Sequence, residues 1–372
     1  MTLVKAATIL RPTKCASRKR STIGDCMSEA GRSWARRVRR LCLYAGGIAL
    51  GMCLTVWATA ALQFDFPDSR LRTPLSILYV VVLGAVLWIT KTGVGRLVVC
   101  VLGFLLVLGG WLTLKPSNTR EWQADVAQTP WAEIDGRHVT IHNMRDCTYR
   151  AEFDYTCQWK TRTLDLDKID GADLFITYWG SPWIAHPIVS FTVTGEDPIA
   201  MSVETRKEVG ETYSAVRGFF RYYELIYIIS NERDVVRLRT NYRTGEDVYL
   251  FHTRTPPQLA QAVFLDYLHH ANELRSKPEW YNALTDNCTT NVAGHFRDVE
   301  PRGAKLLPSW DWREMLNGKA DEMLYENGDL ATDGLSFAEL KRRAHINAAA
   351  NLANDDPDFS QRVRAGRPGF GK

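Results

Sequence analysis

Several motifs that identify common classes of enzyme are missing from this sequence of 372 residues. No phosphate-binding glycine loop is present: the stretch GGIALG lies inside an apolar run, where glycines serve helix packing. A nucleotide site of that type is therefore not expected. No histidine pair has HExxH spacing and no cysteine pair has CxxC spacing, which argues against a dedicated zinc site. We expect neither a metal nor another cofactor.

Acidic residues are scarce in the first third of the chain. Residues 1–115 contain 16 Lys and Arg but only 4 Asp and Glu, whereas the rest contains 30 basic and 38 acidic residues. An asymmetry of this size indicates two environments rather than one globular body.

Charge is absent from two long apolar runs, 41–63 and 74–90, and a third run, 94–114, carries only Arg96. A helix needs about 20 apolar residues to cross the hydrocarbon core, and the second run is near the lower limit. A cleaved signal peptide does not fit, because about 40 residues precede the first run. Residues 41–115 therefore predict three transmembrane helices. The alternative is that the second run is a buried hairpin element.

The basic tail, residues 1–40, predicts the orientation. Positively charged segments next to a membrane span are usually cytoplasmic, so we expect this tail in the cytoplasm. After three spans, residues 116–368 then lie on the opposite side of the membrane. In a bacterium this gives a multi-pass inner-membrane protein with a periplasmic C-terminal domain and the lipid bilayer as a partner. The tail could instead be a nucleic-acid-binding arm. Its position beside a membrane span favours the interpretation that its charge sets the membrane orientation, and we expect no nucleic-acid partner.

The C-terminal domain reads as strands followed by helices, which predicts an α+β fold. β-branched and aromatic segments with partial alternation predict the strands. These segments are 138–144, 172–179, 187–195, 199–206, 223–230, 234–242 and 247–253. A helix is predicted over 255–274, a short one from Asp286 or Asn287, and a last one over 337–353, after the capping-box sequence SFAE.

Only three cysteines follow the apolar runs, namely Cys147, Cys157 and Cys288. In an oxidising compartment Cys147 and Cys157, which flank a hairpin-like stretch, are expected to form a disulfide; two free buried thiols are the alternative. Cys288 is then left over in WYNALTDNCTTN. In the first turn of a helix its thiolate would be stabilised for nucleophilic attack. A small core cysteine is an equally good interpretation from spacing alone.

A thiol nucleophile needs an imidazole base. The candidates are His138, His142, His186, His252, His269, His270, His295 and His345. His186 is favoured because it opens a strand after the loop WGSPWIA, whereas His295 would lie about 10 Å from Cys288 along one helix. Glu204 and Arg206 share one strand face with Ser202. They are expected to orient the histidine or bind a polar head group, unless they form only a surface ion pair.

Five segments also resemble one known family. They are TYWGSPWIAHPIVSFTV, SVETRKEVGETYS, YELIYIISNERDVVRLRTNYR, EWYNALTDNCTTN and PDFSQRVR. Together they are similar to the Lnb-like N-terminal periplasmic domain over roughly residues 130–366. The resemblance implies a bacterial, membrane-attached periplasmic domain with a papain-like or peptidoglycan-peptidase-like fold, a mostly antiparallel sheet and flanking helices.

The namesake branch of that family is a lipoprotein N-acyltransferase that works through a histidine and a cysteine. The resemblance implies that His186 and Cys288 are this histidine and cysteine. It also implies that Glu204 and Arg206 occupy the acidic and basic positions of the family's SxExR strand, and that Asn287 is the asparagine that precedes the cysteine. Two features depart from the family pattern: three spans precede the domain here, and the cysteine pair 147 and 157 is additional.

From these residues we expect a membrane-tethered periplasmic thiol acyltransferase or acyl hydrolase that acts on a phospholipid or lipoprotein. Cys288 would attack an acyl carbonyl, and Asn287 or backbone N–H groups would hold the oxyanion. The alternatives are a periplasmic cysteine peptidase or amidase and a non-catalytic membrane-anchored binding module.

Overall fold

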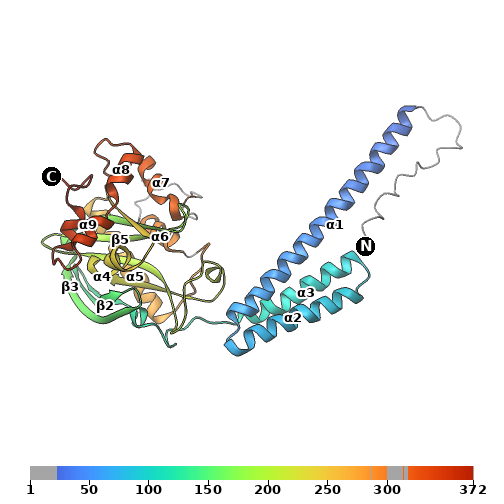
Figure 1. Cartoon of the computed structure of the whole chain (residues 1–372), viewed down its shortest axis with the longest axis horizontal. Helices are drawn as coiled ribbons and strands as arrows, with labels where there is room; N and C mark the ends of the chain where they lie inside the picture. Colours follow the sequence, from blue (N-terminus) through green and yellow to red (C-terminus); the bar gives the residue numbers. More distant parts are fainter. Residues whose placement is uncertain (1–22, 286, 300–312, 314–316, 372) are drawn as a thin grey trace. The chain divides into compact units, whose positions relative to one another are not determined.

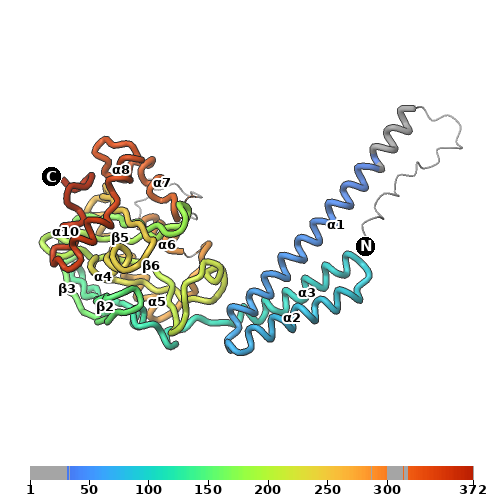
Figure 2. The backbone as a smooth tube through the Cα atoms, viewed as in Figure 1, coloured from blue at the N-terminus to red at the C-terminus, as the bar shows by residue number. Residues whose placement is uncertain are grey.

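The computed structural model describes residues 23–285, 287–299, 313 and 317–371; Figure 2 draws the others in grey. Contacts divide the chain into two compact units, with the boundary between Leu112 and Thr113.

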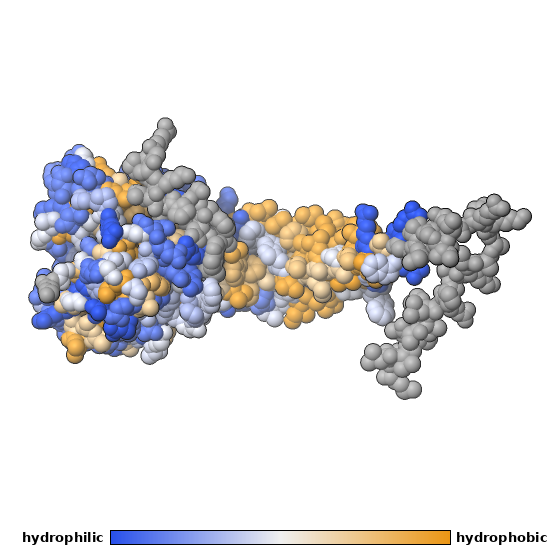
Figure 3. Space-filling view, turned by 90° about the horizontal axis from the view of Figure 1, so that it is seen from above, coloured by the Kyte–Doolittle hydropathy of each residue, from blue (hydrophilic) through white to orange (hydrophobic). Residues whose placement is uncertain are grey.

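The first unit consists of three helices, α1 (Ile23–Asp65), α2 (Ser69–Ile89) and α3 (Gly93–Leu112). Each contains a stretch long and apolar enough to cross a membrane, and hydrophobic residues cover most of the surface of this unit (Figure 3). The prediction of three apolar helices is confirmed. α2 begins earlier than the apolar run, because Asp68 caps it by accepting a hydrogen bond from the Arg70 N–H, so Pro74 lies inside the helix.

The second unit is built on one eight-stranded sheet, which with its flanking helices gives the mixed α+β fold that was predicted. The strands run in the order β1-β2-β7-β6-β5-β4-β8, with β3 paired to β2 from His138 to Ala151, and every pairing except β2–β7 is antiparallel. Their bounds are β1 Trp131–Asp135, β2 His138–Ala151, β3 Asp154–Asp165, β4 Ile169–Trp179, β5 Ala185–Val193, β6 Glu196–Arg206, β7 Glu224–Ser230 and β8 Glu246–His252.

Helices cover both faces of the sheet (Figure 1). The larger apolar core lies under α5 (Pro257–Ser276), α6 (Cys288–Asp298) and the start of α7 (Ala320–Asn327). The smaller core, on the other face, is closed by three short helices, α4 Glu232–Arg237, α9 Asn347–Leu352 and α10 Phe359–Arg364. A further helix, α8 (Phe337–Ala344), precedes α9. Two covered faces account for strands such as β4 and β7 that are buried along almost their whole length.

The predicted strand over 234–242 is wrong. This segment is α4 followed by a π-helical turn, Leu238–Tyr242. Asn231 caps the helix by accepting from the Asp234 N–H, and the buried Asp234 carboxylate accepts hydrogen bonds from the Arg145 guanidinium and the Cys147 N–H of β2. These bonds fix Asp234 in a helical first turn, which outweighs the strand propensity of its neighbours.

Cys147 and Cys157 are joined by a disulfide in the structure. They are directly opposite residues of β2 and β3, and a sequence separation of 10 suits the hairpin between them. The bond lies beside the Tyr149 and Tyr155 rings, so it fastens the outer hairpin of the sheet.

Candidate active site

Cys288 is the first residue of α6, and its side chain is buried, with 4% of the residue exposed. Asn287 is the N-cap. Its Oδ1 accepts from the N–H groups of Thr289 and Thr290 at 2.9 and 3.0 Å, and its Nδ2 donates to the Ala283 carbonyl at 3.1 Å. The amide oxygen is thus occupied in capping, and one N–H of Nδ2 is used by a backbone carbonyl. The expected oxyanion role of the Asn287 side chain stays a prediction. The cap leaves the N–H of Cys288 itself unused.

His186 lies where β5 and β6 separate. The pairing of these strands ends at Ile188 opposite Ser202, although β5 starts at Ala185 and β6 continues to Arg206. In this gap His186 Nε2 lies 2.7 Å from Ser202 Oγ.

The hydrogen bonds around Ser202 assign the nitrogens of His186. The Ser202 hydroxyl donates to Glu204 Oε1 at 2.7 Å, so it accepts from His186 Nε2–H. Nε2 is also 3.2 Å from that Glu204 oxygen. The other nitrogen, Nδ1, is therefore the one that remains to exchange a proton with the Cys288 thiol, whose charge acts on the pKa of His186.

The charges around His186 favour its protonated form. Burial is the largest single effect and disfavours the imidazolium, as does Arg239. The Glu204 carboxylate and the Cys288 sulfur together outweigh these two effects, so the pKa of His186 rises to about 9. Burial likewise disfavours the Glu204 carboxylate, yet His186 and Arg239 hold the pKa of Glu204 well below its usual range. At neutral pH the pair is an imidazolium beside a carboxylate.

Arg239 contacts the same oxygen of Glu204 as His186. Its guanidinium lies 2.8 Å from Glu204 and 3.4 Å from Glu246. Arg239 belongs to the π-helical turn that the sequence predicted as a strand, so its position beside the site was missed.

Arg206 makes its hydrogen bonds outside this network, and its expected role in orienting the histidine or binding a polar head group stays a prediction. Its guanidinium donates to the carbonyls of Val126 and Ala127 and to Asn118 Oδ1, and it stacks over the Trp122 ring. Although Arg206 follows Glu204 by two residues on one strand face, its long side chain extends beyond the site and fastens the segment that precedes β1.

Asn317 is a site residue that no sequence pattern indicated. Its Nδ2 donates to Cys288 Sγ at 3.3 Å, although 29 positions separate the two residues. The next residue, Gly318, lies so close to the backbone of Pro182 and Trp183 that a Cβ there would clash. This close approach fixes the Asn317 amide beside the sulfur.

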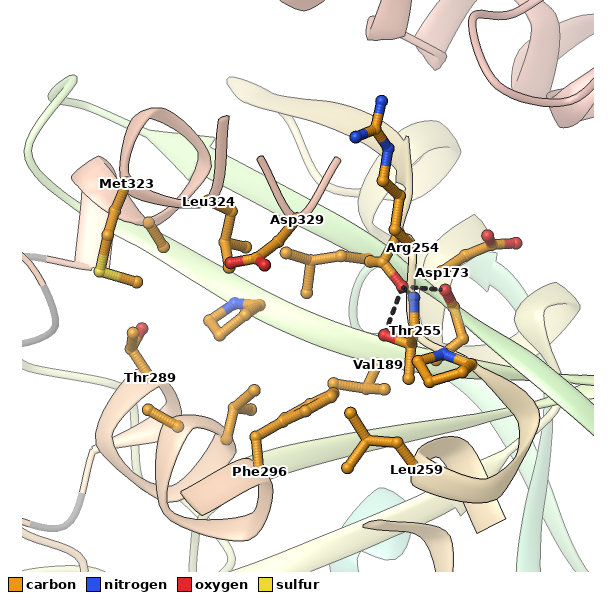
Figure 4. Close-up of a pocket in the computed structure, with 18 residues that line it drawn as sticks. Asp173, Val189, Arg254, Thr255, Leu259, Thr289, Phe296, Met323, Leu324 and Asp329 are labelled. Atoms are coloured by element: carbon orange, nitrogen blue, oxygen red, sulfur yellow. Dashed lines mark hydrogen bonds between the residues drawn. The ribbon is translucent and has the colours of Figure 1, made fainter. Parts of the chain in front are cut away.

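An apolar pocket of about 120 Å³ lies between α6, α7 and strands β4 and β5 (Figure 4). It is lined mainly by Leu174, Val189, Val292, Ala293, Phe296 and Met323. Thr289, which follows Cys288, and Pro187, which follows His186, also line the pocket. The buried Thr289 Oγ1 has no hydrogen-bond partner among the described residues. The two elements that carry the cysteine and the histidine thus also form walls of an apolar pocket.

Comparison with known proteins supports the family resemblance. Residues 155–318 match the family model described as the Lnb N-terminal periplasmic domain, and this range includes His186, Glu204, Cys288 and Asn317. No curated protein and no solved structure matches the chain. The three apolar helices and the family match together fit a membrane protein with an Lnb-type periplasmic domain.

Proposed function

We propose that this chain is a membrane-anchored periplasmic thiol acyltransferase or acyl hydrolase that acts on a lipid or lipoprotein. The observation that carries the proposal is the arrangement of Cys288, His186 and Glu204. A buried thiol at a helix N-terminus interacts electrostatically with an imidazole that a carboxylate keeps protonated. This is the arrangement that cysteine nucleophiles require.

In the first half-reaction the Cys288 thiolate attacks the acyl carbonyl carbon, and the carbonyl electron pair moves to oxygen. When the tetrahedral intermediate collapses, the bond to the leaving alcohol or amine breaks and His186 Nδ1–H protonates that group. Cys288 then carries the acyl group as a thioester, and His186 is neutral. In the second half-reaction His186 accepts a proton from the incoming amine or water, which attacks the thioester and releases the thiolate.

The oxyanion has two donors at the site. The N–H of Cys288 is not used by the Asn287 cap, and Asn317 Nδ2 already donates to the sulfur. An acyl carbonyl bound at Sγ would bring its oxygen within reach of both groups, and such donors stabilise the charge that develops in the transition state.

The apolar pocket supports an acyl substrate rather than a polar one. Its lining is almost entirely apolar, so it can take several carbon atoms of an acyl chain out of water, at about 0.8 kcal/mol for each methylene. Anchoring through α1 to α3 would keep the domain near the lipid supply. The orientation with residues 1–40 in the cytoplasm and the domain in the periplasm is part of the proposal.

The test uses the full-length chain in detergent with p-nitrophenyl octanoate as acyl donor. Mass spectrometry of the peptide that contains Cys288 should detect an added octanoyl group, which hydroxylamine at neutral pH removes because it is a thioester. The group should be absent in Cys288→Ala and strongly reduced in His186→Ala. A chain that forms no thioester but cleaves an amide probe would favour the peptidase alternative, and a chain that does neither would favour the binding module.

A further inference from the structure

A second cluster of polar side chains lies between α5 and α6. It consists of Asp266 and His270 of α5 and His295 of α6, and one ligand atom from each lies within 4.8 Å of the other two. His295 Nδ1 is 2.7 Å from Asp266 Oδ2, and His270 Nδ1 is 3.5 Å from the same oxygen. His295 is only 2% exposed, whereas His270 is partly exposed.

A chain of hydrogen bonds assigns the protons of His295. Asn291 Nδ2 donates to the Asn287 carbonyl at 2.9 Å, so Asn291 Oδ1 is the acceptor that faces Tyr227. The Tyr227 hydroxyl donates to that oxygen and therefore accepts from His295 Nε2–H, 2.8 Å away.

In the neutral form of His295, this assignment leaves Nδ1 with a lone pair instead of a proton. That lone pair faces the Asp266 carboxylate at 2.7 Å, and two acceptors at this distance need a positive centre between them. A metal ion bound by both ligand atoms would supply this charge.

We propose that Asp266, His270 and His295 bind a zinc ion, with water in the fourth position. One imidazole nitrogen from each histidine and one carboxylate oxygen form a common set of three protein ligands for zinc. The bond from His295 Nε2–H to Tyr227 is the outer hydrogen bond that a metal-binding histidine normally makes.

The distances require little movement. Ligand atoms of a tetrahedral zinc site are roughly 3.3 Å apart, from metal–ligand distances of about 2.0 to 2.1 Å. The distances from the two histidines to Asp266, 2.7 and 3.5 Å, lie on either side of that value, and all three ligand atoms lie within 4.8 Å of one another. His270 Nδ1 lies 3.1 Å from the Asp266 carbonyl oxygen and would exchange this hydrogen bond for the ion. A polar cavity of about 140 Å³, lined by His270, His295, Thr290 and Asp298 among others, adjoins the cluster and has room for the water ligand.

The site would link two helices that the sequence separates. Asp266 and His270 are one turn apart on α5, and His295 follows 29 residues after Asp266. The hydrogen-bond chain from His295 ends at the carbonyl of Asn287, the residue before Cys288. Zinc would therefore stabilise the position of α6. This inference does not depend on the proposed acyl transfer.

The test compares the full-length protein in detergent with the variants His270→Ala and His269→Ala, after all thiols have been blocked with iodoacetamide. His270 is the ligand to remove, because it is partly exposed and its loss should be tolerated. His269 is the matched control: it is the preceding histidine of the same helix and lies outside the cluster. Zinc is titrated against a chromophoric chelator, and thermal melting is followed with zinc and with excess chelator.

We expect wild type and His269→Ala to bind one more zinc ion than His270→Ala and to melt at a higher temperature with zinc than with chelator. His270→Ala should lose that extra ion and at least half of the melting shift. Asp266→Asn should behave like His270→Ala, which guards against an effect of His270 on folding alone. Equal zinc binding and equal melting shifts in wild type, His270→Ala and Asp266→Asn would overturn the proposal.

Discussion

Replacing Glu204 with Gln should weaken the reactivity of Cys288 by removing one charge while keeping the size of the side chain. The carboxylate is the main group that raises the pKa of His186 to about 9, against the opposing effects of burial and Arg239. Without it, those two remaining effects lower the pKa of His186, so the imidazole becomes neutral at a lower pH.

The size of the expected decrease in the alkylation rate follows from the pKa of His186 in wild type and the ordinary pKa of a histidine. At pH 7.5 a group with a pKa of about 9 is protonated in roughly 97% of molecules, whereas one with the ordinary value of 6.5 is protonated in roughly 9%. The positive imidazole stabilises the thiolate that reacts. Alkylation of Cys288 by iodoacetamide at pH 7.5 should therefore fall about tenfold or more in Glu204→Gln. The direction of the pH dependence follows: in wild type the imidazolium is present below about pH 9 and is lost as the pH rises through that value.

The assay is the rate of carbamidomethylation at the Cys288 peptide, followed by mass spectrometry from pH 6 to pH 9 in the full-length chain. Glu246→Gln is the matched control, because Glu246 also pairs with Arg239 but does not contact His186. It should alkylate at nearly the wild-type rate. A Glu204→Gln rate within twofold of wild type across this range, alongside a slow His186→Ala, would refute the role of Glu204. If His186→Ala were also unchanged, the activation of Cys288 by the histidine would be refuted.

Three further predictions concern other parts of the domain. Asn317→Ala should slow acylation by p-nitrophenyl octanoate by about 100-fold to 1,000-fold, because it removes an oxyanion donor, while alkylation by iodoacetamide, which forms no oxyanion, stays within about threefold. Ala293→Phe should fill the apolar pocket and abolish any preference for octanoyl over acetyl esters in the same assay, without changing alkylation. The double change Cys147→Ser and Cys157→Ser should lower the free energy of unfolding by about 3 kcal/mol in a urea titration, because it opens a loop with a sequence separation of 10.

The features predicted best from the sequence are those determined by neighbouring residues. Apolar runs without charge predicted three helices, and SFAE predicted the start of α8, where Ser336 accepts from the Glu339 N–H. The DNC sequence predicted a helix start at Cys288, and Asn287 is its cap. Each of these signals depends on chemistry within one or two turns of chain.

The features that the sequence missed depend on distant residues. The last predicted helix, 337–353, is interrupted at His345, because His345 forms a β-bridge with Tyr249 and the Ile346 N–H donates to the Val248 carbonyl. Arg239 reaches Glu204 only because its segment is helical. No pattern of apolar residues encodes such tertiary contacts, so these positions could not be predicted from one sequence.

The disulfide between Cys147 and Cys157 affects which cysteines remain available to pair with Cys288 while the chain folds. Three cysteines follow α3, and any two of them could be oxidised to a pair while the chain is still unfolded. Only 10 positions separate Cys147 from Cys157, whereas Cys288 is more than a hundred positions further on, so the short loop closes at the lower entropic cost. Once the hairpin is sealed, the domain holds no second thiol with which Cys288 could mispair. The outer hairpin would thereby protect the Cys288 thiol from intramolecular oxidation before the protein reaches its native state.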